Sequence, residues 1–594
     1  MKSLLLLCAV LGTAFAHEKR SGGHHEGPQP SDFLNDRLAL LSLLVGGSVL
    51  AFFLIWQNTI RFSNHIRRLT NLNNDTQRYF VTPDPYWAWL KRSVIYAPLF
   101  RTRHNREFRL STALNVGTLP TRFQTVLLLG VIGMNVTLCC VTIDYPGAES
   151  TVLGLIRNRA GTMAVVNLIP LVIMAGRNNP LIRLLNVSFD TWNLLHRWFA
   201  RIVVLESITH VLAWMINKVH TKGWAAVSGS FKSQFIMSGL VAAILFVILV
   251  LHSPSAIRHA FYETFLHLHI LMVVVTFAFL WIHLKDRMQL RFLIGAVVVW
   301  VVERSVRIFH LIYRNFGKKN TTAIVEILPG EALRITLKLA RPWRFQPGKH
   351  LYLYVPSIGF WMSHPFTAAW SDSEDDVSDE KGLVKSRQDV MSIQKKSTIS
   401  LIIRRRTGFT NALFERASET MDGRISVNAM VEGPYGIDHT LDSYGTVMLF
   451  AAGVGITHHV SFVRHLVAGY AAGTVAARKV TLVWIIQSPE HLEWIRPWMT
   501  AILSMEKRRD ILKIMLFITR PRNTREIHSP SSTVQMFPGK PNVQTLLDSE
   551  IEGQVGAMGV LVCGTGSLSD DVRRACRQRQ QSTHIDFLEE SFSW

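Results

Sequence analysis

The hydrophobic and polar positions divide this chain into an apolar first half and a mixed second half. Seven apolar runs in the first half predict membrane-spanning helices, and the third run is short and contains Asn167 and Pro170. The runs cover residues 38–60, 123–143, 160–176, 197–216, 235–252, 262–284 and 290–312. After Lys319, short runs rich in β-branched residues and bounded by Gly or Pro predict a small all-β domain. From about Ser443, apolar strands alternate with helical segments, which is typical of a nucleotide-binding α/β sheet.

This pattern predicts a multi-domain protein with an α-helical seven-span membrane domain, a β-barrel and an α/β domain. Residues 371–396 are polar and largely acidic, and we expect a disordered insertion there. His17, His24 and His25 lie near the N-terminus, in a segment that we interpret as a polar tail rather than a metal-binding one. The expected parts are a signal peptide (1–16), an extracytoplasmic tail (17–37), a first span with a basic cytosolic loop (38–122), a helical membrane domain (123–313), a β-barrel (314–438) and an α/β domain (439–594).

The basic residues indicate the direction of the chain in the membrane. The formal net charge is +22, and many Lys and Arg stand between the first two apolar runs. Positively charged loops stay on the cytoplasmic side, which explains the charge better than nucleic-acid binding does. Lys2, the apolar Leu4–Leu11 and Ala14-Phe15-Ala16 have the pattern of a cleavable secretory signal. With the N-terminus outside and seven spans, the C-terminus is expected in the cytosol. The five cysteines show no disulfide framework and no CxxC metal site.

Four histidines inside the apolar runs share one spacing. His196 and His210 are 14 residues apart, and His269 and His283 are again 14 apart. At about 100° per residue, 14 residues return to nearly the same face of a helix, roughly 21 Å further along its axis. Each helix would therefore carry one histidine near each surface of a hydrocarbon core about 30 Å thick. Ionisable residues at this depth are costly and indicate a function.

The expected topology decides which histidines face each other. The fourth and sixth runs would cross the membrane in the same direction, so His196 would face His269 near the inner surface. His210 would then face His283 near the outer surface. Two histidines per layer are too few for structural zinc, which prefers four ligands, whereas haem iron takes two axial ligands. Hydrogen-bonded packing or a proton relay is the alternative.

Neighbouring residues leave two questions open. His267 competes with His269, but Trp281 stands 14 residues after it, so we prefer His269. Arg197 and Arg201 could meet haem propionates on the inner side, or they could simply follow the positive-inside rule.

Two motifs in the β domain have the composition of a flat-ligand site. A Pro-Gly turn leads to His350, and the segment His364-Pro365-Phe366-Thr367 would place a hydroxyl and backbone amides beside a flat ligand. Arg404 precedes Gly408-Phe409-Thr410, and glycine, hydroxyl and arginine together suit a pyrophosphate. A basic hairpin is the alternative interpretation of the arginine-rich segment.

A glycine-rich turn follows the first apolar strand of the α/β domain. Gly453, Gly455, Ile456 and Thr457 lie between that strand and a helical segment, where glycines let a phosphate approach the helix N-terminus. Further elements are the expected tight turn at Gly433-Pro434, Cys563-Gly564 at a later strand end, and the terminal Trp594. A terminal aromatic can cover a flavin ring, although core packing is the ordinary explanation.

The order of these motifs resembles the fungal ferric/cupric reductases, relatives of the NADPH oxidases and of soluble ferredoxin–NADP reductases. The resemblance runs from about Arg159 to Trp594 and includes paired histidines, PGxH, HPFT, GPYG, GxGIT, CG and a terminal FxEExFxW. Ala452-Gly453 stands where family members often have two glycines.

The resemblance implies a transmembrane flavocytochrome b that holds two b-type haems and binds FAD and NADPH in a cytosolic ferredoxin–NADP reductase-like module. The expected haem ligands are His196, His210, His269 and His283. The expected FAD contacts are His350, His364, Pro365, Phe366, Thr367, Arg404, Gly408, Phe409, Thr410 and Trp594. The expected NADPH contacts are Gly433, Pro434, Gly453, Gly455, Ile456, Thr457, Cys563 and Gly564.

By the same resemblance, electrons would pass from NADPH through FAD and the two haems to external ferric iron, often siderophore-bound, or to cupric copper. No side chain is expected to act as an acid or base at the outer face. The protein would support iron or copper uptake at the plasma membrane, with the vacuolar membrane as the alternative, and an iron-uptake permease or oxidase would be its partner. A superoxide-generating NADPH oxidase is the nearest alternative, and a haem-free transporter or receptor is the alternative from another class.

Overall fold

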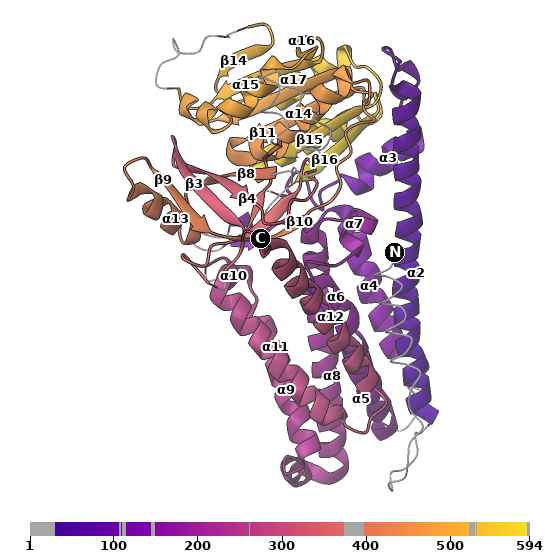
Figure 1. Cartoon of the computed structure of the whole chain (residues 1–594). Helices are drawn as coiled ribbons and strands as arrows, with labels where there is room; N and C mark the ends of the chain where they lie inside the picture. The colour runs from indigo at the N-terminus through magenta and orange to yellow at the C-terminus, as the bar shows by residue number, and fades with distance from the viewer. Residues whose placement is uncertain are drawn as a thin grey trace, which may run out of the picture.

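The computed structural model describes residues 30–105, 108–109, 115–143, 149–260, 262–360, 362–373, 397–521, 529 and 531–590. The expected signal peptide, residues 374–396 of the acidic insertion, and Trp594 lie outside the described residues. Figure 1 shows a long helical part, a β-barrel above it and an α/β domain at the far end. The chain therefore places its three kinds of structure one after another along a single axis.

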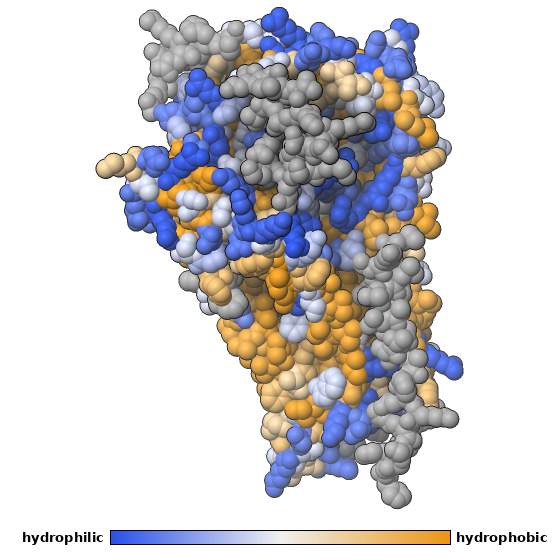
Figure 2. Space-filling view, in the orientation of Figure 1, coloured by the Kyte–Doolittle hydropathy of each residue, from blue (hydrophilic) through white to orange (hydrophobic). Residues whose placement is uncertain are grey.

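The helical part consists of long apolar helices with short connecting ones. They are α2 (Pro30–Asn71), α4 (Arg122–Cys140), α5 (Glu149–Val166), α6 (Leu168–Ala175), α7 (Leu181–Leu185), α8 (Phe189–Ser230), α9 (Gln234–His252), α10 (Ser255–Ala260), α11 (Tyr262–Leu284) and α12 (Leu290–Asn315). Figure 2 shows a hydrophobic surface over this part, with hydrophilic residues beyond it at both ends. Such a belt is what a lipid bilayer requires of the helices that cross it.

Six helical segments among the described residues are long and apolar enough to cross a membrane. They are Ser31–Asn71, Arg122–Cys140, Thr151–Ala175, Phe189–Ser230, Gln234–His252 and Tyr262–Leu284. The third run, expected as the short stretch 160–176, is longer because α5 begins earlier and continues almost directly into α6. The seventh run forms α12, but Arg291, Glu303 and Arg304 lie within it, and it does not belong to these six. The count of seven spans therefore stays a prediction.

Local capping fixes where the second span begins. The Thr121 side chain accepts a hydrogen bond from the Gln124 backbone N–H, and the Gln124 side chain accepts one from the Thr121 N–H. This reciprocal capping box satisfies two N–H groups that a helix start would otherwise leave without partners. Helix α4 therefore starts at Arg122, directly after the basic segment.

The β-barrel follows α12 and is built as the alternating pattern predicts. Its strands are β3 (Thr322–Leu328), β4 (Ala332–Lys338), β5 (His350–Tyr354), β6 (His364–Thr367), β7 (Trp370–Ser373), β8 (Ser397–Arg404), β9 (Arg424–Asn428) and β10 (Met430–Tyr435). They form a five-stranded sheet, β7-β8-β4-β3-β9, and a three-stranded sheet, β10-β5-β6. Helix α13 (Phe409–Ser418) follows β8, so the arginine-rich segment is a strand-to-helix junction, and the basic-hairpin alternative is wrong.

The α/β domain confirms the predicted buried parallel strands. Its six strands, in the order β14-β13-β12-β11-β15-β16, are all paired in parallel. They are β11 (Thr446–Ala452), β12 (Lys479–Ile486), β13 (Leu512–Ile518), β14 (Val534–Pro538), β15 (Met558–Cys563) and β16 (Ile585–Glu590). The helices are η5 (Gly453–Gly455), α14 (Ile456–Ala471), η6 (Pro489–Trp494), α15 (Arg496–Ser504), α16 (Arg508–Ile511), α17 (Val543–Glu552) and α18 (Gly566–Arg579). The strand order reverses between β11 and β15, which is where such sheets bind their ligands.

Helix α12 attaches the barrel to the membrane part. The Asn315 side-chain amide donates to the Val431 carbonyl and accepts from the Val431 N–H. It thus makes the two hydrogen bonds that the backbone of a neighbouring strand would make with β10. Glu432 is buried and pairs with Arg307 of α12 at 3.0 Å, while the Tyr354 hydroxyl donates to it. Burial alone would raise the pKa of Glu432, but the arginines outweigh it and hold the pKa below its usual value.

A basic segment that follows the first span packs against one side of the α/β domain. This strap, residues 64–105, includes η1 (Arg78–Phe80), α3 (Pro85–Leu90) and η2 (Lys91–Ile95). Arg67 donates to the Ser443 hydroxyl at 2.9 Å, and the buried Lys91 pairs with the half-buried Asp586 at 2.5 Å. In Figure 1, α2 continues past the membrane part and runs beside the α/β domain. The loop that the charge pattern identified only as cytosolic is thus largely a docked structural element.

Candidate functional site

The four equally spaced histidines meet as two facing pairs. The rings of His196 (α8) and His269 (α11) have centres 6.5 Å apart at an interplanar angle of 66°. Those of His210 and His283, on the same two helices, lie 6.2 Å apart at 85°. We call them the module-side pair and the far pair, because His196 and His269 lie at the end that faces the barrel. The structure thus brings together the residues that the topology was expected to pair.

The ring separation in each pair fits two ligands on opposite sides of one metal ion. Metal–imidazole bonds of about 2.0–2.1 Å, added to the short distances from ring nitrogen to ring centre, place the two ring centres roughly 6 Å apart. Both pairs meet this separation. Each pair is therefore spaced for a bis-histidine haem iron.

Backbone carbonyls select the nitrogen that each ring offers. The Nδ1 atoms of His196, His210 and His283 lie 2.9, 2.7 and 2.8 Å from the carbonyl oxygens of Leu171, Arg157 and Phe235. A carbonyl only accepts, so Nδ1 carries the hydrogen and Nε2 keeps its lone pair for a metal. His269 Nδ1 has no hydrogen-bond partner among the described residues. Its ring is held instead beside Phe265, 5.5 Å away.

Two glycines give the far pair its space. A Cβ on Gly161 would lie 2.6 Å from His210 Nδ1, and one on Gly239 would lie 2.6 Å from His283 Nδ1. Each glycine stands four residues after the carbonyl that accepts from that histidine, so one helical turn supplies both the acceptor and the space. The spacing of the histidines drew attention to the ligands, but nothing in the sequence connected these glycines to them.

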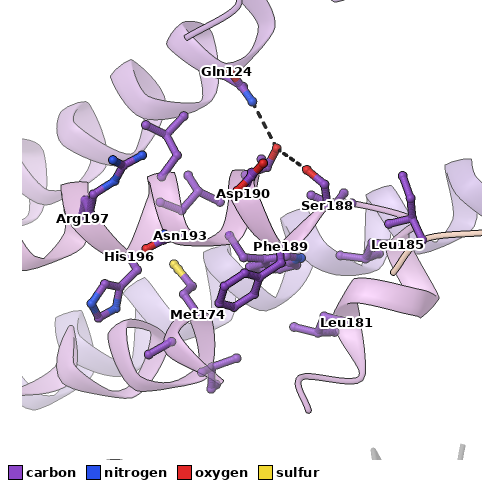
Figure 3. Close-up of a pocket in the computed structure, with 18 of the residues that line it drawn as sticks. Gln124, Met174, Leu181, Leu185, Ser188, Phe189, Asp190, Asn193, His196 and Arg197 are labelled. Carbon is purple, nitrogen blue, oxygen red and sulfur yellow. Dashed lines mark hydrogen bonds between the residues drawn. The ribbon is translucent and has the colours of Figure 1, made fainter. Parts of the chain in front are cut away.

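A large cavity connects the module-side pair with the barrel. Its volume is about 2810 Å³, and its walls include His196 and His269 together with Lys349 and His364 of the barrel. The far pair does not line it. Figure 3 shows the part near His196, where His196 and Arg197 extend on different sides of α8. The cavity reaches from the first histidine layer to the barrel strands that were predicted to face a flat ligand.

Basic side chains lie beside the module-side pair. Arg197, Arg201 and Arg258 all line the same cavity, so the two arginines predicted as propionate partners are placed where such groups would enter. His267, the competitor of His269, is exposed, and its Nδ1 lies 2.8 Å from the Glu263 carbonyl of its own helix. The geometry therefore favours His269 as the partner of His196.

Several of the barrel residues predicted for FAD lie on β6, at the end of β8 and at the start of helix α13. Strand β6 carries His364-Pro365-Phe366-Thr367, and the His364 ring stacks on Phe409 with ring centres 4.5 Å apart. Gly408 caps α13 with a φ of 72°, and a Cβ there would meet nothing within 4 Å. Arg404 ends β8 and the Thr410 hydroxyl accepts from the Arg406 N–H at 2.9 Å. A left-handed glycine, an open helix N-terminus and nearby arginines fit a pyrophosphate.

His350 and the Gly433-Pro434 segment lie on neighbouring strands of the barrel. His350 begins β5 and is buried, and Tyr435 of β10 is its register partner. Gly433-Pro434 was expected as a tight turn, but it lies inside β10, where the pairing register shifts. The turn prediction was wrong because β10 continues past these two residues, which form an irregularity between the β5-paired residues Glu432 and Tyr435.

The glycine-rich turn of the α/β domain opens at the strand-order reversal. Gly453 has a φ of 54° and open space around it, whereas a Cβ on Gly455 would lie 2.2 Å from the Cys563 carbonyl oxygen. Ile456 and Thr457 start α14, and a Cβ on Gly564 would lie 2.8 Å from the Ala452 methyl. Ala452 therefore fits this turn because its neighbour Gly564 has no side chain. Burial raises the pKa of the Cys563 thiol, so it stays protonated at neutral pH.

Three family models match consecutive parts of the chain. Residues 160–280 match the ferric reductase like transmembrane component, residues 317–380 an FAD-binding domain, and residues 444–577 the ferric reductase NAD binding domain. These ranges contain His196, His210 and His269, the HPFT strand and the GxG turn, whereas His283 lies three residues beyond the first range. The site residues themselves stay predictions.

Curated relatives are similar over most of the chain. The Saccharomyces cerevisiae ferric/cupric reductase transmembrane component 2 is 24% identical over 85% of this chain and 71% of its own length. A ferric reductase transmembrane component 3 from the same yeast is 24% identical over 80% of this chain and 68% of its own length. A solved ferredoxin NADP+ reductase from Neisseria gonorrhoeae aligns with 46% of this chain and 99% of its own, at 14% identity and a TM-score of 0.30, too low to support an argument.

Proposed function

Because the chain carries the transmembrane, FAD-binding and NAD-binding domains of the ferric reductase family, we propose that it is a transmembrane metalloreductase. It takes electrons from NADPH on the module side and delivers them to ferric or cupric chelates on the other side of the membrane. The observation that carries this proposal is the presence of two facing histidine pairs on the same two helices, of which the module-side pair lines a cavity that reaches the barrel. Relatives named ferric/cupric reductases support it.

When bound, a flavin would exchange two electrons with NADPH and single electrons with haem iron. His196 and His269 would hold the module-side haem, and His210 and His283 would hold the far one. The carbonyls of Leu171, Arg157 and Phe235 accept from Nδ1 of three of these rings, which leaves Nε2 free to bind a metal. Arg197, Arg201 and Arg258 would bind propionates at the module-side end.

The cytosolic module orients the two nucleotides. Arg404, Gly408 and Thr410 would bind the FAD pyrophosphate at the α13 N-terminus, and strand β6 would supply further FAD contacts. Gly453, Gly455 and Thr457 would bind the NADPH phosphates at the α14 N-terminus, and Cys563 and Gly564 would contact the nicotinamide side of the nucleotide. The protonated thiol of Cys563 adds no charge there.

The remaining assignments concern the surroundings of the protein. We propose an N-terminus outside the cytosol, a C-terminus inside it and a place in the plasma membrane, with an iron-uptake permease or oxidase as partner. The basic strap supports this direction, because basic segments stay on the cytoplasmic side. A superoxide-generating oxidase is not favoured, since curated relatives such as those from yeast are named as ferric or cupric reductases.

Replacing a far-pair histidine tests the proposal directly. His210→Ala and His283→Ala each remove one of the two axial ligands of the far haem, so electrons have no path to the far surface. Reduction of an impermeant ferric chelate by whole cells should be abolished, and purified membranes should contain half as much b-type haem. His267→Ala, two residues from His269 but exposed, is the matched control and should leave both unchanged.

Surface reduction that persists in His210→Ala and His283→Ala would contradict the proposed path. A parent protein that forms superoxide in place of ferrous chelate would support the oxidase. Purified membranes without a b-type haem spectrum would support the haem-free class.

A further inference from the structure

A second group of histidines lies buried in the cytosolic module, and none of its members was predicted as a nucleotide contact. His439 belongs to the linker between the barrel and β11, His458 to the first turn of α14, and Glu590 ends β16. Their ligand-capable side-chain atoms all lie within 4.8 Å of one another. Three segments that are far apart in the sequence therefore bring two imidazoles and one carboxylate to a single point.

His458 is the member that ordinary packing does not explain. It is completely buried, and neither of its ring nitrogens has a hydrogen-bond partner among the described residues. Buried polar groups are nearly always hydrogen-bonded, so each exception calls for an explanation. The adjacent His459 is equally buried but lies 3.2 Å from the Leu561 carbonyl through Nε2, so it follows the ordinary rule.

The other two members already have the separation of metal ligands. His439 Nε2 lies 3.1 Å from Glu590 Oε2, and their side chains are only 3% and 10% exposed. Ligands about 2.0–2.2 Å from a tetrahedral metal ion lie roughly 3.4 Å from one another. The His458 ring is perpendicular to that of His439, with centres 5.8 Å apart, so a small movement of one side chain completes the set.

We infer that His439, His458 and Glu590 form a divalent transition-metal site of the zinc type in the cytosolic module, separate from the two histidine pairs of the membrane part. Two histidines and one glutamate, with a fourth position for water, are a recurrent zinc ligand set. His439 and Glu590 line the large cavity, which gives an ion a route to the site. The inference goes beyond the proposed function and does not depend on it.

Because its three ligands come from three separate segments, a bound ion would crosslink those segments. A bound ion ties together the domain linker, the start of the NADPH helix and the end of the last described strand. Since binding to the folded state alone adds stability, zinc should raise the unfolding temperature of the cytosolic module.

The test measures zinc in the full chain. His17, His24 and His25 are replaced by alanine in every sample, so that the N-terminal histidines do not contribute. The protein is loaded with ZnCl₂ in lipid nanodiscs and washed with a weak chelator, and zinc is quantified by mass spectrometry. We expect one zinc ion per chain and a zinc X-ray absorption spectrum with two imidazole ligands.

Single substitutions identify the ligands. His458→Phe, His439→Gln and Glu590→Gln should each lower the zinc affinity by at least about 100-fold, since even indirect partners of a metal contribute 10–100-fold. Each should also remove the zinc-dependent rise in unfolding temperature. His465→Gln is the matched control, because this histidine lies on the same helix, is partly exposed and pairs with Asp442. It should keep the zinc.

FAD and haem contents equal to those of the parent show that a variant is folded. If His458→Phe does not fold, the two milder variants decide the outcome. Absence of zinc from the washed parent, or unchanged zinc in His439→Gln and Glu590→Gln, would overturn the inference.

Discussion

The two histidine pairs share one spacing and one ring separation, but the protein surrounds them differently. The far pair is closely packed around its Nδ1 atoms: both Nδ1 atoms meet a carbonyl, and both rings pack against a glycine. The module-side pair lines a cavity of about 2810 Å³, and only one of its rings meets a carbonyl. The same pattern in the sequence thus produces one closed and one open site.

This difference fits two tasks under the proposed function. The closed site fixes its ligands rigidly, which protects the far haem where the surrounding lipid supplies no hydrogen bonds. The open site must receive electrons from a flavin in the barrel, so its wall has to include residues of both domains. We therefore expect substitutions beside the two pairs to have effects of different size and kind.

The largest effect should follow from adding a side chain at either of the two glycines that pack against the far pair. In Gly161→Ala or Gly239→Ala the new methyl group would lie 2.6 Å from a ring atom, so the histidine must move. We expect the far haem to bind about 10- to 100-fold more weakly, the range found when the partners that orient metal ligands are lost. Difference spectra of purified membranes and whole-cell ferric reduction measure the loss.

The control for these variants lies on α5, the helix that carries Gly161. A Cβ at Gly154 of α5 would meet nothing within 4 Å, so Gly154→Ala should keep both haems. Alanine favours a helix over glycine by about 1 kcal/mol, so loss of haem cannot be ascribed to a weakened helix. Full haem content in Gly161→Ala and Gly239→Ala would show that the far pair is not closely packed around its Nδ1 atoms.

The histidine pairs and the buried strands were predictable because each repeats a local pattern. Two spacings of 14 residues, read with the expected direction of the helices, were enough to match His196 with His269. The runs that form β11, β12, β13 and β15 are continuous and apolar, as strands covered on both faces must be.

The environment of the pairs was not predictable, because it depends on tertiary contacts. Gly161 and Gly239 are ordinary glycines until α5 and α9 lie against α8 and α11. The same holds for His458, whose missing partners become apparent only when β16 and the linker lie beside it. A sequence states which groups are present, but burial and pairing decide what each group does.

A smaller effect is expected from removing cations beside the open pair. Arg197→Gln combined with Arg258→Gln takes two guanidinium groups from the cavity wall near His196. A hydrogen bond to a charged group contributes about 1.5–3 kcal/mol, so the module-side haem should bind at least about 10-fold more weakly. The far haem should stay, which resolved low-temperature spectra can show.

Arg424→Gln is a suitable control, because this arginine is exposed on β9 of the barrel. Equal loss of both haems in the Arg197/Arg258 double variant would mean that these arginines stabilise the helices as a whole. It would remove the distinction between the two sites.

The smallest effect should follow from loosening the strap, which lies beside the open site only. The buried Lys91 pairs with the half-buried Asp586 at 2.5 Å, and the strap residues Trp87 and Tyr96 line the same cavity as His196. Lys91→Met leaves Asp586 with Arg67, at 3.8 Å, and with the imidazole of His584, at 3.5 Å. Breaking a buried ion pair costs about 3 kcal/mol, so the strap should undock more often without releasing either haem. We expect a few-fold slower reduction of haem by NADPH in an anaerobic stopped-flow experiment, faster hydrogen exchange in α3 and η2, and no change when dithionite is the reductant.

Arg78→Met, an exposed substitution in the same strap, is the control and should change neither the rate of haem reduction by NADPH nor the rate of hydrogen exchange. Slower reduction by dithionite as well would mean that the strap supports the histidine pairs themselves, and that the open site is not distinguished by its dependence on the cytosolic module.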